Sequence, residues 1–267
     1  MHIRVGYDII YDCAGPTPMM LLLSLRPERM NDLVTPQAMT VMPNVPTRTY
    51  LDHFGNLCTR VLAPRGPIRF TADYVVSDSG LSDQGAHGAI QHEVDDLPSE
   101  LLLFLLGSRY CETDQLTTAA WSLFGGTAPG WTRVQAIVEW VNERLTFGYP
   151  YARNTRTAFE AFNERVGVCR DFAHLAVALC RCMNIPARYC TGYLPDIGVP
   201  LDLPMDFSAW FEVYLGGRWH TADARHAHPR IGRILMAHGR DATDTAISTA
   251  FGPTTISRFD VIAEQMA

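Results

Sequence analysis

Apolar and polar residues alternate with a period of two in the first third of the chain. This alternation covers residues 3–11 and 68–76 and is typical of half-buried β-strands. Between them, prolines divide the chain into short segments, and residues 47–62 have the pattern of a hairpin. Short strands at such close spacing predict a β-sandwich-like amino-terminal domain, which with its linker covers residues 1–95.

The pattern changes after this β-rich part. Residues 79–96 are rich in Gly, Ser, Asp and His, and we interpret them as a linker or long surface loop. Beyond them, apolar residues recur every three or four positions, most clearly between Val134 and Leu145, which is typical of a helix with one buried face. Helices are expected over residues 101–106, 113–124, 132–145 and 157–165. Residues 96–267 are therefore expected to form a second, core domain.

Composition and charge narrow the class of protein. The chain is 47% hydrophobic and 19% charged, which favours a packed core over disorder, and its net charge of −6 argues against a nucleic-acid partner. The longest apolar run, residues 19–23, is far shorter than the roughly 20 residues that span a bilayer, and no secretory signal opens the chain. The seven cysteines follow no disulfide pattern. We therefore expect a cytoplasmic protein with reduced thiols and no membrane partner.

One cysteine has the surroundings of a nucleophile. Cys169 follows Gly167-Val168, and the apolar run after it has helical spacing, which places the thiol in the first turn of a helix. Backbone N–H groups and the helix dipole at such an end favour a thiolate and lower its pKa. Gly167 permits a close approach of the chain, and Asp171 is expected to favour the dipole. A buried, inert thiol remains the alternative at this point.

A hairpin is predicted further along the chain. Residues 208–215 and 218–225 have strand-like sequences, and Gly216-Gly217 between them is the signal of a two-residue turn. Pairing outward from that turn places Trp210 opposite Asp223.

Three motifs together resemble the transglutaminase-like superfamily. They are the Gly-Val-Cys-Arg-Asp-Phe segment around Cys169, the Ala-Trp-Phe-Glu-Val-Tyr strand after Ser208 and the Trp-x-x-x-Asp strand that ends at Asp223. In particular, the chain resembles bacterial transglutaminase-like cysteine proteases with an amino-terminal β domain. The resemblance implies an α+β fold, in which a papain-like core with a nucleophile helix packed on an antiparallel sheet follows the β-sandwich-like domain. It also implies acyl transfer on peptide or protein amides through a Cys169 thioester; neither a cofactor nor a metal ion is expected.

The resemblance also assigns the site residues. Cys169 matches the family's nucleophile and Asp223 its orienting acid, whereas Ser208 occupies the position of the family's histidine. In the predicted hairpin, Ser208 and Asp223 are diagonal neighbours on one face, about 7–8 Å apart. His220 and His226 fall on the opposite face by the alternation of a strand.

No histidine is therefore expected to take the proton of Cys169. Accessory roles for His220, His226 and Trp210 remain open. Two hypotheses follow: a transglutaminase-like cysteine protease or amide acyl-transferase, which we favour, and a catalytically impaired pseudoenzyme that binds peptides. The basic residues from Arg225 to Arg230, with Arg233, His238 and Arg240 beyond them, form either a solvated surface or a site for an anionic or carboxylate-bearing ligand.

Overall fold

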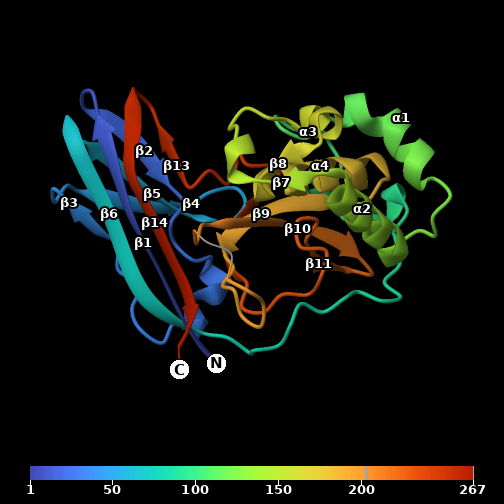
Figure 1. Cartoon of the computed structure of the whole chain (residues 1–267), viewed down its shortest axis with the longest axis horizontal. Helices are drawn as coiled ribbons and strands as arrows, with labels where there is room; N and C mark the ends of the chain where they lie inside the picture. The colour runs from blue at the N-terminus through green and yellow to red at the C-terminus, as the bar shows by residue number, and fades with distance from the viewer. Residues whose placement is uncertain (202–203, 267) are drawn as a thin grey trace.

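The computed structural model describes residues 1–201 and 204–266, and within them a β-sandwich lies beside a mixed helix-and-sheet core (Figure 1). The first sheet of the sandwich consists of β14 (Thr254–Gln265), β1 (His2–Cys13), β6 (Gly66–Ser77) and β3 (Thr40–Met42), in that order. The second consists of β13 (Ser248–Ala250), β2 (Thr17–Leu21), β5 (Leu57–Ala63) and β4 (Thr47–Leu51). Their inward-facing residues form one apolar cluster, which includes Ile9, Leu21 and Phe70. The alternation along β1 and β6 produces this buried face.

The sandwich is completed by the carboxyl-terminal end of the chain. β14 pairs with β1 along nearly its whole length, and β13 pairs with β2. The expected assignment of residues 96–267 to the core therefore needs correction, because residues 248–265 belong to the sandwich. Local pattern identified the amino-terminal strands, but pairing between opposite ends of the chain is a tertiary feature.

The core contains an antiparallel sheet in the order β11-β10-β9-β12. Its strands are β9 (Ala187–Tyr193), β10 (Ser208–Leu215), β11 (Arg218–Ala222) and β12 (Ile234–Gly239). The α-helices are α1 (Thr113–Phe124), α2 (Trp131–Arg144), α3 (Ala158–Glu164) and α4 (Cys169–Cys182). The shorter elements are the parallel pair β7 (Thr146–Phe147) and β8 (Val166–Gly167), and the 3-10 helices η1 (Pro27–Asp32), η2 (Val94–Asp96), η3 (Ser99–Phe104) and η4 (Tyr149–Tyr151). The α+β fold expected from the sequence is confirmed.

Helix α4 is the centre of the core. It contacts α1, α2 and α3 as well as the sheet strands β9 and β10, and every residue from Asp171 to Cys182 is buried. A helix that is buried on all sides has to satisfy its few polar groups internally. Arg181 does so by donating to the carbonyl oxygens of Ala187, at 2.9 and 3.0 Å, and Arg240, at 2.6 Å. Helix α4 is thus held firmly on the sheet.

The predicted hairpin is present, but it is shorter than expected. Gly216 and Gly217 both have positive φ, at 57° and 86°, as a tight two-residue turn requires. The register of β10 and β11 is the predicted one, yet the last paired residues are Phe211 and Ala222. The expected pairing of Trp210 with Asp223 is therefore wrong, because the chain leaves the ladder at residue 223.

Residues 79–96 connect the sandwich to the core along one side of the molecule (Figure 1). We call this segment the strap. Ser82 forms an isolated β-bridge with Ile231, and the N–H of Asp83 donates to the carbonyl oxygen of Arg230 at 2.8 Å. The strap is therefore attached to the chain just before β12. In the described residues, no helix is long and apolar enough to cross a membrane.

Candidate active site

A cavity of about 120 Å³ opens at the amino-terminal end of α4. Cys169, Ser208 and His226 all line it, although they come from α4, from β10 and from the turn after β11. Further lining residues include Phe147, Tyr149, Leu194, Asp206 and Arg225. Cys169 is half-buried, whereas the other six cysteines, all in the described part of the chain, are buried. The structure thus brings the predicted nucleophile and the serine at the family's histidine position together.

Backbone geometry at the start of α4 positions the thiol. Cys169 is the first residue of the helix, as predicted, and the carboxylate of Asp171 accepts a hydrogen bond from the N–H of Val168 at 2.9 Å. A Cβ added to Gly167 would lie only 2.6 Å from the Cβ of Asp171. Only glycine therefore allows the carboxylate of Asp171 to approach so closely.

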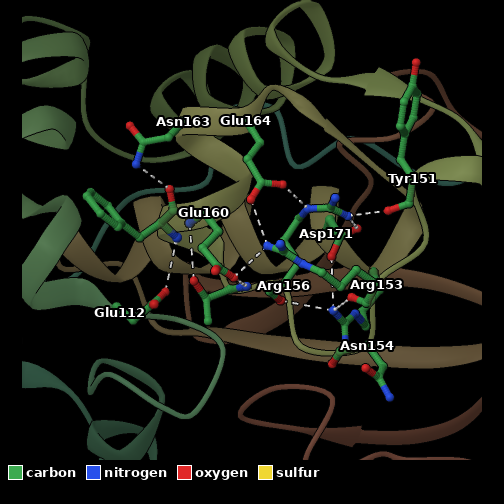
Figure 2. A network of polar contacts seen from close by, with 12 residues as sticks. Glu112, Tyr151, Arg153, Asn154, Arg156, Glu160, Asn163, Glu164 and Asp171 are labelled. Atoms are coloured by element: carbon green, nitrogen blue, oxygen red, sulfur yellow. Dashed lines mark hydrogen bonds and ion pairs between the residues drawn. The ribbon is translucent and has the colours of Figure 1, made fainter.

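A buried ion-pair network fixes Asp171 in turn (Figure 2). The Arg156 guanidinium contacts Asp171 at 3.0 Å, Glu164 at 2.9 Å and the carbonyl oxygen of Tyr151 at 2.6 Å. The side chains of Arg156 and Asp171 are 6% and 0% exposed. The network ties α3 and η4 to the first turn of α4. A pair as buried as this one is strongly destabilising to break, because the remaining charge loses its partner.

The thiol itself is not activated in the way the sequence suggests. Burial raises the pKa of Cys169 to about 11, and the carboxylate of Asp206 adds to this effect. Arg225 and the backbone N–H groups of Ala209 and Arg170 favour the thiolate, but they do not outweigh burial. The expected lowering of the pKa by the helix end is therefore wrong. At neutral pH the thiol is protonated and needs a base.

Asp223 holds an imidazole at this cavity. One oxygen of the Asp223 carboxylate, Oδ2, lies 2.8 Å from Nδ1 of His226, and the other accepts the backbone N–H groups of Arg225, at 2.9 Å, and His226, at 3.1 Å. Arg233 contacts Oδ2 at 2.7 Å. Burial alone would raise the pKa of Asp223, but Arg233 and His226 outweigh it and hold that pKa well below its usual range. The carboxylate therefore stays ionised and orients the imidazole.

The exclusion of His226 by strand alternation is wrong, and the reason is local. β11 ends at Ala222, and the N–H of Ala227 closes a turn by donating to the carbonyl oxygen of Asp223 at 3.0 Å. Ala227 also has a left-handed backbone, with φ at 54°. Residues in this turn do not follow the alternation of a strand. The spacing Asp-x-x-His just after a short strand was the sequence signal for this arrangement.

The remaining predicted site residues have separate positions. Ser208 is buried, and its Oγ has no hydrogen-bond partner within the described residues. His220 lies outside the Cys169 cavity, and its Nε2 is 3.1 Å from the carbonyl oxygen of Leu215. Trp210 is also outside that cavity, with its ring centre 5.1 Å from the guanidinium carbon of Arg233. Of the three residues whose accessory roles the sequence left open, His226 is the one that lines the Cys169 cavity.

The basic stretch from Arg225 to Arg233 is not a plain solvated surface. The side chains of Arg230 and Arg233 are only 4% and 7% exposed; Arg230 is paired with Asp196, and Arg233 is paired with Asp83 and Asp223. Among the residues that the structure describes, no group of three or more His, Cys, Asp or Glu side chains is placed to hold a metal ion.

Comparison with known proteins agrees with this architecture. The sequence model of the transglutaminase-like superfamily matches residues 118–224, which include Cys169 and Asp223. A crystal structure from Cytophaga hutchinsonii, described as a "Putative Cysteine Protease", is 29% identical, with a TM-score of 0.85 over 99% of this chain and 90% of that chain. The likeness to that protein therefore extends over the sandwich as well as the core.

A second relative is matched over a shorter region. An uncharacterized protein of Mycobacterium leprae is 31% identical over 116 residues, and the match spans only 42% of that protein and 42% of this chain. The family match, the fold and the shared cavity of Cys169 and the Asp223-bound His226 lead to one assignment. Residues 118–224 of the core form a domain of the transglutaminase-like superfamily.

Proposed function

We propose that this protein is a thiol acyl-transferase of the cysteine-protease type, which acts on amides of peptides or proteins. The observation that carries the proposal is the 2.8 Å contact between His226 and Asp223, made at the cavity that Cys169 also lines. A protonated thiol, an oriented imidazole and an ionised carboxylate are the parts that nucleophilic catalysis by cysteine requires. A cytoplasmic location stays a prediction from the sequence.

The chemical steps follow from these parts. Nε2 of His226 accepts the proton of the Cys169 thiol as the sulfur attacks the amide carbonyl carbon, which forms a carbon–sulfur bond. The imidazolium then donates that proton to the departing amine as the carbon–nitrogen bond breaks, leaving a thioester. Water or a second amine attacks the thioester, passes a proton through His226 and releases the thiol. With water the reaction is hydrolysis, and with an amine it is transamidation.

The pseudoenzyme hypothesis rests on Ser208 alone. It requires that no histidine serve Cys169, and the position of His226 at the same cavity argues against it. A peptide-binding module without turnover therefore becomes the second candidate.

His226→Ala is expected to slow both turnover and alkylation of Cys169 at pH 7. A thiol with a pKa of about 11 is ionised in only about one molecule in 10⁴ at pH 7, so without His226 the alkylation rate should rise with pH towards about 11. With His226 present, the rate should rise already at lower pH. Turnover should fall by roughly 10²–10⁴-fold. Iodoacetamide labelling of Cys169 followed by mass spectrometry measures the first effect, and hydrolysis of fluorescein-labelled casein the second.

His87→Ala is the matched control, because His87 is an exposed strap histidine outside the Cys169 cavity. It should leave both profiles unchanged. Identical labelling profiles for the native protein and His226→Ala would remove His226 from the proposal and favour the pseudoenzyme.

Ser208→His is expected to restore turnover to the His226→Ala variant, by up to about 10²-fold. Position 208 lines the same cavity, and the unpartnered Oγ of Ser208 shows that no existing hydrogen bond has to be broken among the described residues. Ser208→Asn in the same background is the control, since an amide does not transfer protons at neutral pH. Casein hydrolysis measures all variants. Equal turnover with His and Asn would show that an imidazole at position 208 does not reach the thiol.

A further inference from the structure

A chain of charged contacts runs from the strap to His226. Oδ2 of Asp83 lies 2.7 Å from Nε of Arg233, and Nη2 of Arg233 lies 2.7 Å from Oδ2 of Asp223. The same Asp223 oxygen is 2.8 Å from Nδ1 of His226. The side chains of Arg233 and Asp223 are 7% and 5% exposed, so water screens these charges little. The imidazole is therefore linked electrostatically to a carboxylate in the segment that joins the two parts of the molecule.

The position of Arg233 is fixed from several directions. The guanidinium lies over the ring of Trp210, and Asp83 also accepts the backbone N–H of Arg230 at 3.0 Å. Burial alone would lower the pKa of Arg233, but Asp223 and Asp83 raise it, so the guanidinium keeps its charge. A permanent positive charge thus shares one carboxylate oxygen with His226.

Arg233 and Asp83 have opposite effects on the protonation of His226. The positive charge of Arg233 opposes the imidazolium that forms when His226 takes a proton, and it offsets part of the attraction of Asp223. Asp83 in turn offsets part of the charge of Arg233. Because catalysis needs His226 to accept a proton and later release it, the balance between these charges decides the pH range in which it works.

We propose that Asp83 and Arg233 are positioning residues that set the pH range over which His226 serves Cys169, so that seating of the strap tunes the site. This inference rests on the proposed role of His226 as the base. Neither residue lines the Cys169 cavity, and both act through Asp223. Through Asp83 alone, the strap thus adds one charge to the balance around His226, besides connecting the sandwich to the core.

Other charged or titratable groups also face His226 and stay unchanged in the test. They are Asp223 and His228 on its own turn, and Cys169, Asp206, Arg225 and the Arg230–Asp196 pair at the cavity.

The test is the pH profile of Cys169 alkylation by iodoacetamide, which requires no substrate. The rate falls in acid as His226 becomes protonated and stops accepting the thiol proton. Arg233→Gln should move the midpoint of this acid limb to higher pH, by about one unit or tenfold in rate on the limb. Asp83→Asn should move it to lower pH, by about half as much. Asp95→Asn, the same change at an exposed strap position, should leave the midpoint in place.

The opposite directions separate this role from a merely structural one, which would reduce the rate without moving the two midpoints apart. Shifts in the same direction, or shifts of less than about 0.2 units in both variants, would overturn the proposal. If Arg233→Gln does not fold, Asp83→Asn with its 20% exposed side chain provides the test alone, through the direction of its shift.

Casein hydrolysis by the same variants distinguishes failure of the proposed function from failure of the coupling between the strap and His226. Midpoints that move as expected without casein turnover in any form would remove the proposed function and keep the coupling. Turnover with unmoved midpoints would keep the function and remove the coupling.

Discussion

Cys169→Ala is expected to reduce amide turnover by a factor of 10⁴ or more, on the order of the loss seen when a catalytic nucleophile is removed. The thioester cannot form without the sulfur, whereas the cavity, His226 and Asp223 stay in place. The small side-chain change at a half-buried position should leave the fold intact. Hydrolysis of fluorescein-labelled casein and incorporation of dansylcadaverine into casein measure the two outcomes of the proposed reaction.

Cys13→Ala provides the matched control for Cys169→Ala. It removes a thiol at the end of β1, in the sandwich and away from the cavity, and should retain full turnover. Full turnover of Cys169→Ala would contradict the assignment of the nucleophile. Casein binding by both variants and by the native protein, without turnover by any, would instead support the peptide-binding alternative.

Asp171→Ala is expected to lower the free energy of unfolding by about 3–5 kcal/mol, because it leaves Arg156 buried and short of one partner. The substitution also frees the N–H of Val168, which Asp171 accepts at the start of α4. The nucleophile should then lose its fixed position, and turnover should fall together with stability. Urea unfolding followed by circular dichroism measures the stability, and iodoacetamide labelling reports the exposure of Cys169.

Glu164→Gln is the control at the outer end of the same network (Figure 2). Its side chain is 35% exposed, so the loss of its charge should cost less than about 1 kcal/mol. Asp171→Asn keeps an acceptor for Val168 and should fall between the two. A cost below about 1 kcal/mol for Asp171→Ala would show that the buried network does not hold the start of α4.

Two features of the core could be predicted from local sequence patterns: the start of α4 and the register of the β10–β11 hairpin. Cys169 begins a helix because an apolar run of helical spacing follows Gly167, and the structure confirms that position. The register of β10 and β11 follows from Gly216 and Gly217, because only a few backbone conformations join strands through two residues. Such features depend on neighbours in the chain, and a sequence pattern can therefore predict them.

Tertiary structure decided the rest. The pairing of β14 with β1 joins opposite ends of the chain, and the pKa of Cys169 depends on burial by distant elements rather than on its helix end. His226 reaches the cavity because the chain leaves β11 at Asp223, a point that strand alternation cannot predict. The sequence by itself determined the superfamily resemblance, the helix that begins at Cys169 and the hairpin register. Which histidine stands beside the thiol, and which charges surround it, depended on packing between segments far apart along the chain.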